Sequence, residues 1–160
     1  MRVEGIIFDF GRTLYDPTSQ GLFPKTVETL SGLARRGLKL GLVSLAETDD
    51  TERTVQELAD LGINQFFQAI DIIARSVKTK DFTKVLKSLG FEDKPESCMV
   101  VGDNLKKEIV SGNAIGAYTV QTRQRLLIDS GPMDESETPK ATVNTIEELI
   151  PLVDNLNSLS

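Results

Sequence analysis

Short apolar runs alternate along this chain with longer stretches in which apolar residues recur at helical spacing. The runs predict buried strands over residues 3–8, 38–43, 66–73, 98–101, 117–121 and 141–143. The helical spacing predicts helices over residues 24–36, 51–61, 79–89, 105–115 and 146–156. Because strands that alternate with helices are typical of βαβ units, we expect an α/β fold. It should be a three-layer sandwich: a Rossmann-like central parallel sheet with helices on both faces and the first strand in the middle.

The length of the chain is typical of a single domain, which we place at residues 1–160. The stretch 129–140 combines Gly131, Pro132 and Pro139 with several acidic residues, which is typical of a loop. We therefore expect one domain with a mobile loop at 129–140.

Composition narrows the classes of function. A formal net charge of −6 argues against nucleic acid as the partner, because nucleic-acid binders usually carry a basic face. No apolar run is long enough to span a membrane and no signal-peptide pattern is present, so we expect a cytoplasmic protein. Cys98 lies inside an apolar run and should be a buried small hydrophobe. Histidine is absent, so any chemistry must use carboxylates, lysines or hydroxyls.

Two of the predicted strands end next to a carboxylate. Asp9 follows the run 3–8, and Asp103 follows the run 98–101 after one glycine. Ligands in an open α/β sheet bind outside the carboxyl ends of the strands. Carboxylate oxygens there suit Mg²⁺, which prefers hard oxygen ligands and keeps several waters. The simpler interpretation of Asp103 is a helix N-cap, but its pairing with Asp9 favours a metal site.

The segments around these carboxylates resemble the motifs of the haloacid dehalogenase (HAD) superfamily. The loop Asp9-Phe10-Gly11-Arg12-Thr13-Leu14 is similar to the signature loop of that superfamily. Three further matches follow in the same order: Ser44 at the end of the second strand, Lys78 or Lys80 before a helix, and Val101-Gly102-Asp103-Asn104 with Glu108. The resemblance covers nearly all of the chain.

The resemblance implies a Mg²⁺-dependent phosphatase that forms an aspartyl-phosphate on Asp9. Asp9, the backbone carbonyl of Gly11 and Asp103 would bind the metal ion. Glu108 would hold metal-bound water or steady a lysine. Ser44 and the motif lysine would contact the phosphoryl oxygens and stabilise the transition-state charge.

Lys78 and Lys80 are the two candidates for the motif lysine that contacts the phosphoryl oxygens. We favour Lys78, because it precedes Thr79, the expected helix cap, and its ammonium can lean over the sheet edge. Lys80 would lie in the first helical turn, where the helix dipole disfavours a cation unless an anion is near. Either lysine could instead be a solvated surface residue. Ser44 by itself could be an ordinary strand-end hydroxyl bonded to local backbone.

The signature loop departs from the superfamily pattern at two positions. Gly11 stands where the phosphatases carry a second aspartate, the general acid and base for the leaving oxygen. Losing such assistance typically costs about 10² to 10⁴ in rate. Arg12 stands where a glycine is usual. It can clamp a phosphoryl group but cannot supply a proton at neutral pH, and a solvated loop arginine is the alternative.

The superfamily often inserts a cap domain, for which this chain has little room. Residues 15–23 are too few for one, and residues 44–78 hold only one predicted helix and one strand. A capless member leaves its site open. That is compatible with a phosphorylated small molecule or a phosphorylated protein as substrate, and with a partner subunit or second copy of the chain acting as a lid.

The sequence thus favours a capless Mg²⁺-dependent phosphohydrolase that turns over slowly. The alternative is a non-catalytic module on the same scaffold that binds metal and phosphate or another protein. A receiver-like phosphoacceptor domain is less consistent, because Asp9 has no acidic neighbour and Asp103 lies late in the chain.

Overall fold

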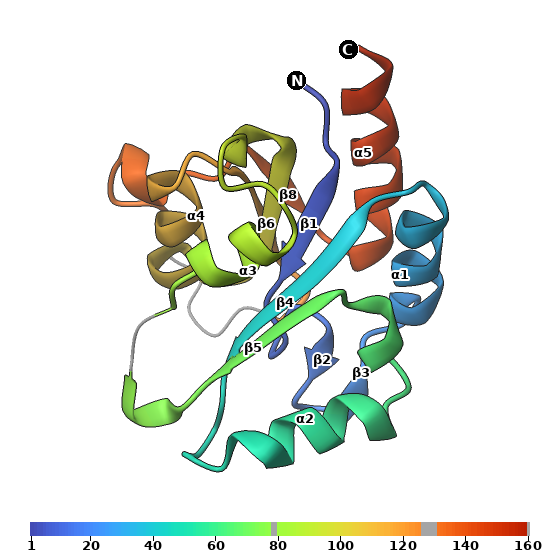
Figure 1. Cartoon of the computed structure of the whole chain (residues 1–160), viewed down its shortest axis with the longest axis vertical. Helices are drawn as coiled ribbons and strands as arrows, with labels where there is room; N and C mark the ends of the chain where they lie inside the picture. Colours follow the sequence, from blue (N-terminus) through green and yellow to red (C-terminus); the bar gives the residue numbers. More distant parts are fainter. Residues whose placement is uncertain (78–79, 126–130, 160) are drawn as a thin grey trace.

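The computed structural model describes residues 1–77, 80–125 and 131–159 of the chain. Six parallel strands form the central sheet, in the order β5-β4-β1-β6-β7-β8 (Figure 1). These strands are β1 (Gly5–Phe8), β4 (Lys39–Leu45), β5 (Ala69–Ile73), β6 (Cys98–Gly102), β7 (Tyr118–Thr122) and β8 (Ala141–Val143). The α-helices are α1 (Thr26–Arg35), α2 (Thr51–Asp60), α3 (Thr83–Ser88), α4 (Val110–Ala114) and α5 (Leu149–Ser158).

Helices cover both faces of the sheet, as the sequence predicts. Side chains of β1 alternate between two hydrophobic clusters, because successive residues of a strand point to opposite faces. Ile6 and Phe8 pack in the cluster that contains buried residues of α1, α2 and α5. Ile7 packs in the cluster that contains Val85 and Leu86 of α3. The fold is therefore a three-layer α/β sandwich with β1 in the middle of the sheet (Figure 1).

Helix α3 begins later than the apolar pattern predicts. It starts at Thr83, and Asp81 accepts hydrogen bonds from the backbone N–H of Thr83, at 2.9 Å, and from its hydroxyl. The predicted cap, Thr79, lies outside the described residues. Because α3 begins only at Thr83, Lys80 precedes the helix and is not part of it.

The predicted helix 105–115 has two parts. A single π-helical segment, Leu105–Ile109, leads into the short helix α4. Asn104 caps the segment, because its side-chain oxygen accepts a hydrogen bond from the N–H of Lys106 at 2.9 Å. π-Helical turns are rare and are frequent at functional sites. Here the segment carries Glu108, one of the candidate site residues.

A small hairpin between the first loop and α1 was not predicted. Strand β2 (Tyr15–Asp16) pairs antiparallel with β3 (Gly21–Leu22). The ring of Tyr15 stacks on Phe10 with centroids 5.3 Å apart, and Asp16 forms an ion pair with Arg125 at 3.1 Å. Strands of two residues are too short to produce a recognisable period of alternation in the sequence.

Part of the predicted loop 129–140 is anchored to the domain. Residues 129 and 130 lie outside the described residues, and Glu135–Glu137 forms a 3₁₀ turn. The side-chain amide of Asn113 donates to the carbonyl oxygens of Ser136 and Thr138, at 3.0 Å each. The mobility of the loop stays a prediction.

The single cysteine, Cys98, is buried, as the sequence predicts. Cys98 is fully buried in β6, and burial raises the pKa of its thiol to about 12. It therefore behaves as a small core residue and not as a nucleophile. Among the described residues, no helix combines the length and the apolar character needed to cross a membrane.

Candidate active site

The sheet register brings the two predicted carboxylates to one edge. Strand β1 pairs with β6 so that Phe8 lies opposite Val101, and with β4 so that Phe8 lies opposite Leu42. All three strands run in the same direction, so their carboxyl ends lie side by side. Asp9 therefore emerges between Ser44 on one side and Asp103 on the other.

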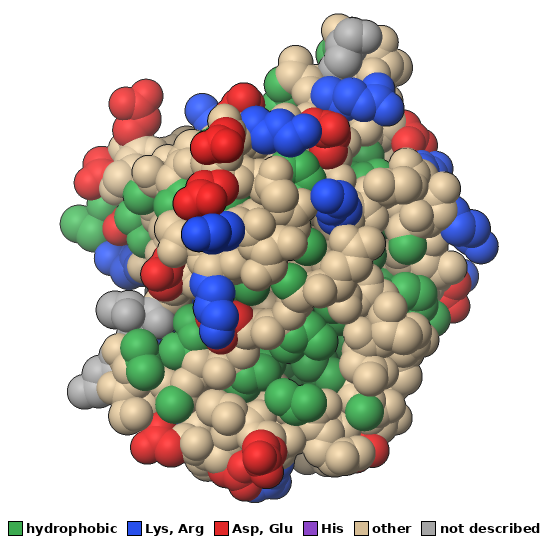
Figure 2. All heavy atoms as spheres, viewed as in Figure 1, with side chains coloured by type: hydrophobic (Ala, Val, Ile, Leu, Met, Phe, Trp, Pro, Cys, Tyr) green, Lys and Arg blue, Asp and Glu red, His purple; other side chains and the backbone are tan. Residues whose placement is uncertain are grey.

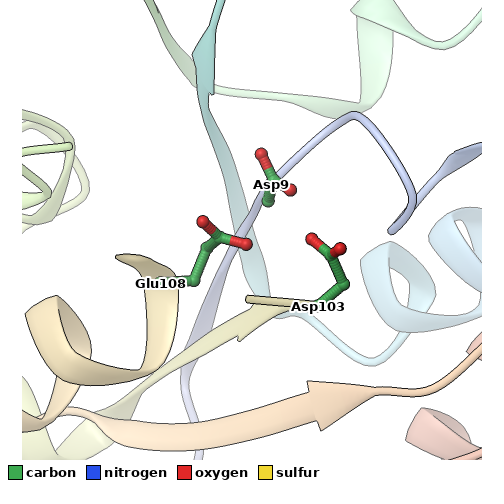
Figure 3. Close-up of side chains that lie close together, drawn as sticks. All are labelled: Asp9, Asp103 and Glu108. Carbon is green, nitrogen blue, oxygen red and sulfur yellow. The ribbon is translucent and has the colours of Figure 1, made fainter. Parts of the chain in front are cut away.

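Three carboxylates meet at this edge. Asp9, Asp103 and Glu108 each place one oxygen within 4.8 Å of the other two, and their side chains point toward a common centre (Figure 3). Asp9 and Glu108 are buried, and Asp103 is half-buried. The cluster draws on β1, the turn after β6 and the π-helical segment, so it forms only when the sheet is assembled.

Lys80 supplies the counter-charge inside the cluster. Its ammonium forms an ion pair with Asp9 Oδ1 and donates to Glu108 Oε2 at 3.1 Å. The Lys80 side chain is only 4% exposed. Burial would lower the pKa of Lys80, but the two carboxylates outweigh it and hold that pKa above its usual value. The lysine is therefore charged.

One ammonium does not balance three carboxylates. Burial, with the nearby charge of Glu108, raises the pKa of Asp9 to about 6 despite the ammonium of Lys80. Burial and the charge of Asp9 likewise raise the pKa of Asp103 to about 6, and burial raises the pKa of Glu108. The cluster is thus short of positive charge, which a divalent cation would supply.

The donor atoms that remain fit a hard cation such as Mg²⁺. Both oxygens of Glu108 are engaged, because Oε1 accepts from the N–H of Asn104 at 3.2 Å and Oε2 accepts from Lys80. Asp9 Oδ2 has a long 3.4 Å contact with the Thr13 hydroxyl, and Asp103 is partly open to solvent. Carboxylate oxygens next to water are the ligand set that Mg²⁺ prefers. Of the two roles expected for Glu108, this arrangement favours the second, in which Glu108 steadies the lysine.

The structure therefore places Lys80 at the site, whereas the sequence favoured Lys78. Lys78 lies outside the described residues, so its predicted role stays a prediction. Lys80 was placed in a first helical turn because the helix was expected to begin at Thr79. With α3 beginning at Thr83, the dipole penalty does not arise, and Asp9 and Glu108 provide the anions that hold the ammonium.

A cleft of about 520 Å³ opens over the cluster. The predicted site residues that line it are Asp9, Gly11, Arg12, Ser44, Lys80, Asp103 and Glu108. Ser44 is buried, with 4% of its surface exposed, and lines the cleft. Three further charged residues, Glu47, Arg75 and Lys107, also line it, and only Arg75 and Lys107 were not considered from the sequence. Each lies within a few residues of a strand end or motif, but a charged residue there is indistinguishable from a solvated one by sequence.

Arg12 has an unusual backbone conformation. Its φ is 63°, in the left-handed region that residues with a side chain rarely adopt, and its N–H donates to the carbonyl of Tyr15 at 2.8 Å. Its side chain is half-buried at the cleft and has no ion pair or hydrogen bond with the described residues. Such conformations concentrate at functional sites, where surrounding structure holds them. This placement favours a site residue over a solvated loop arginine.

Gly102 is required by the position of Glu108. A Cβ atom at Gly102 would lie 2.3 Å from Cγ of Glu108 and 2.6 Å from its Oε1. We expect Gly102→Ala to displace Glu108 and to lower the free energy of unfolding by about 1–3 kcal/mol. Urea denaturation measures this loss. Gly131→Ala is the control, because a Cβ there meets nothing within 4 Å, and equal effects of both substitutions would contradict the prediction.

Fold and site together define a Rossmann-like α/β protein with a carboxylate and lysine centre at the carboxyl edge of its sheet. A family model described as haloacid dehalogenase-like hydrolase matches residues 17–116. The chain therefore belongs to the haloacid dehalogenase-like hydrolase family, as its motifs indicate.

Proteins similar to this chain are consistent with that assignment. A glyceraldehyde 3-phosphate phosphatase of Methanocaldococcus jannaschii is 32% identical over 141 residues, and one of Methanopyrus kandleri is 30% identical over 138 residues. Both matches cover 84% of this chain but 57% of the relative, so the chain spans little more than half of their length. An uncharacterised Listeria monocytogenes protein has the same fold, with a TM-score of 0.73 at 21% identity over 96% of this chain and 99% of that one.

Proposed function

We propose that the protein is a Mg²⁺-dependent phosphohydrolase that forms an aspartyl-phosphate on Asp9 and turns over slowly. The observation that carries this proposal is the contact of Lys80 with Asp9 and Glu108 beside Asp103 at the floor of an open cleft. The relatives named glyceraldehyde 3-phosphate phosphatase support a phosphate ester as substrate.

In the proposed first step, a carboxylate oxygen of Asp9 attacks phosphorus and the bond from phosphorus to the ester oxygen breaks. Lys80 donates to Oδ1 of Asp9 and so holds the carboxylate in position. Mg²⁺ bound by Asp9, the Gly11 carbonyl and Asp103 would neutralise the repulsion between the carboxylate and the phosphoryl group. Ser44 and Arg12 would donate to the phosphoryl oxygens at the cleft wall. Water then cleaves the aspartyl-phosphate, which releases phosphate and restores Asp9.

The proposed slowness follows from Gly11. The leaving oxygen needs a proton when it is a poor leaving group, and Gly11 has no side chain to supply one. Esters with good leaving groups need little protonation. The protein should therefore hydrolyse p-nitrophenyl phosphate faster than alkyl phosphates, with a dependence on Mg²⁺. Turnover that is lost in Asp9→Asn would support the mechanism, and equal turnover by both proteins would exclude it.

Metal binding can be tested without turnover. We expect Mg²⁺ at a hundredfold excess over its dissociation constant to stabilise the folded protein by about 2.7 kcal/mol. Thermal or urea unfolding with and without Mg²⁺ measures this effect. Asp103→Asn should reduce it strongly, whereas Asp93→Asn, which removes an exposed carboxylate outside the cluster, should not. The same Mg²⁺ response in all three proteins would mean that the ion does not bind at the cluster.

A non-catalytic module remains the second candidate, and Gly11 is the observation that favours it. Such a module would bind Mg²⁺ and phosphate analogues at the same cluster but hydrolyse no phosphoester. In the described residues, β2 and β3 lie between the first loop and α1, and α2 and one 3₁₀ turn lie between Ser44 and β5. We propose that the site is open, so that a second copy or a partner subunit could cover it in either case.

A further inference from the structure

We propose that the cleft selects phosphate esters that carry a second anionic group, which Arg75 or Lys107 binds away from the phosphoryl position. The chemical class is a small phosphorylated carboxylic acid or a bisphosphate. This inference rests on the proposed function, because it names the substrate class for the same cleft.

The two cations come from elements on either side of the strand that carries Asp9. Asp9 follows β1, and the phosphoryl group would lie against it, between Ser44 and Asp103. Arg75 follows β5, two strands away on one side, and Lys107 follows β6 on the other. Neighbouring strands are about 4.8 Å apart, so the backbone of Arg75 is on the order of 10 Å from that of Asp9. Because the guanidinium is held at the Glu47 carbonyl, a group bound there would be a different part of the ligand.

The surroundings of the two side chains also indicate a ligand. Arg75 donates to the backbone carbonyl of Glu47 at 3.4 Å, which holds its guanidinium at the cleft wall without neutralising it. Among the described residues, Arg75 and Lys107 form no ion pair, although both line the cleft. Glu47 is the one acidic residue lining it outside the metal cluster.

Some cations elsewhere on the surface have acidic partners, whereas others, such as Arg35 and Lys140, have no ion pair with the described residues. Lys106, next to Lys107, forms an ion pair with Glu137, and Lys84 lies 3.9 Å from Asp71. Figure 2 shows basic and acidic side chains interspersed over one face of the molecule. In a chain with a net charge of −6, unpaired cations that line a cleft attract anionic ligands.

The occupant is a small molecule and not a nucleic acid. The cleft has a volume of about 520 Å³, and the cations lie within it, not along a surface stripe. A nucleic-acid site would need a basic face, which the composition does not provide. A phosphate ester with a carboxylate a few bonds away presents both charges inside a cleft of this size.

Glyceraldehyde 3-phosphate and 3-phosphoglycerate are a matched pair for the test. They share the three-carbon chain and the phosphate ester, but the first ends in an aldehyde and the second in a carboxylate. Calorimetric titration in the presence of Mg²⁺ should show about tenfold tighter binding of 3-phosphoglycerate, since a few exposed ion pairs contribute modestly. Raising the salt concentration should reduce this preference, because exposed ion pairs are screened.

Variants assign the preference to the two cations. Arg75→Gln/Lys107→Gln should bind the two ligands about equally, mainly by losing affinity for 3-phosphoglycerate. Lys84→Gln/Lys106→Gln removes the same charge outside the cleft and should keep the preference. If the cations serve the phosphoryl group, the first double variant weakens both ligands equally, and the inference is wrong. It is also wrong if the wild type binds both ligands equally.

The readout separates this inference from the proposed function. Binding is measured without turnover, so a preference for 3-phosphoglycerate would support the inference even if p-nitrophenyl phosphate is not hydrolysed. Equal binding together with Mg²⁺-dependent hydrolysis of p-nitrophenyl phosphate would leave the proposed function standing and overturn the substrate class. The proposed substrate class differs from the substrate in the names of the archaeal relatives, because glyceraldehyde 3-phosphate has no anionic group besides its phosphate.

Discussion

Gly11→Asp is expected to raise the rate of alkyl phosphate hydrolysis by about 10² to 10⁴, the usual contribution of general acid–base catalysis. The structure has room for this change, because a Cβ atom at Gly11 meets nothing within 4 Å. Gly11 is also not among the glycines with positive φ, so a side chain causes no backbone strain there. An aspartate would stand beside Asp9 at the cleft and could protonate the leaving oxygen. The gain on p-nitrophenyl phosphate should be smaller, since that leaving group needs little protonation.

The measurement is kcat/KM on an alkyl phosphate and on p-nitrophenyl phosphate for the wild type, Gly11→Asp and Gly11→Asn. The asparagine variant has nearly the same shape but cannot exchange a proton, so it should show no comparable gain. Equal gains in both variants would indicate a packing effect instead of acid–base catalysis. A well-folded Gly11→Asp protein that is inert on every phosphoester would favour the non-catalytic module.

Lys80→Met is expected to lower the free energy of unfolding by about 3–5 kcal/mol in the absence of divalent metal, as removal of one partner from a buried ion pair does. The substitution leaves the buried carboxylates of Asp9 and Glu108 beside Asp103 without their ammonium. Mg²⁺ should restore part of the loss, because it supplies positive charge to the same cluster. Mg²⁺ should therefore stabilise the variant more than it stabilises the wild type.

Urea denaturation with EDTA and with Mg²⁺ tests both parts of this expectation. Lys84→Met is the matched control, because Lys84 has a side chain that is 76% exposed and should be nearly neutral when replaced. A loss below about 1 kcal/mol for Lys80→Met without metal would be the size of a surface ion pair. That result would show that Lys80 does not hold the cluster together.

The architecture could be predicted from the sequence because it depends on local patterns. Apolar runs between glycine-terminated helices specify parallel strands, and β1 occupies the middle of the sheet as expected. The convergence of Asp9 and Asp103 could also be predicted. Each follows a strand directly or after one residue, and neighbouring parallel strands end at a common edge whatever the details of their packing.

Other features depend on contacts between residues far apart in the chain. The choice of Lys80 required the start of α3 at Thr83, which a hydrogen bond from Thr83 to Asp81 sets and which apolar periodicity does not reveal. Glu108 steadies this lysine because the π-helical segment turns it toward the cluster, where Gly102 leaves space for it. The hairpin 15–22 is too short to have a detectable period.

The sequence by itself thus determined the α/β class, the central position of the first strand and the edge at which the carboxylates meet. These follow from hydrophobic spacing and strand direction, which are properties of short segments. Only the tertiary structure decided which lysine enters the cluster, what Glu108 contacts and which charged residues face the cleft. These features depend on the orientation and burial of single side chains. The sequence alone does not distinguish a charged residue that faces a site from one that faces solvent.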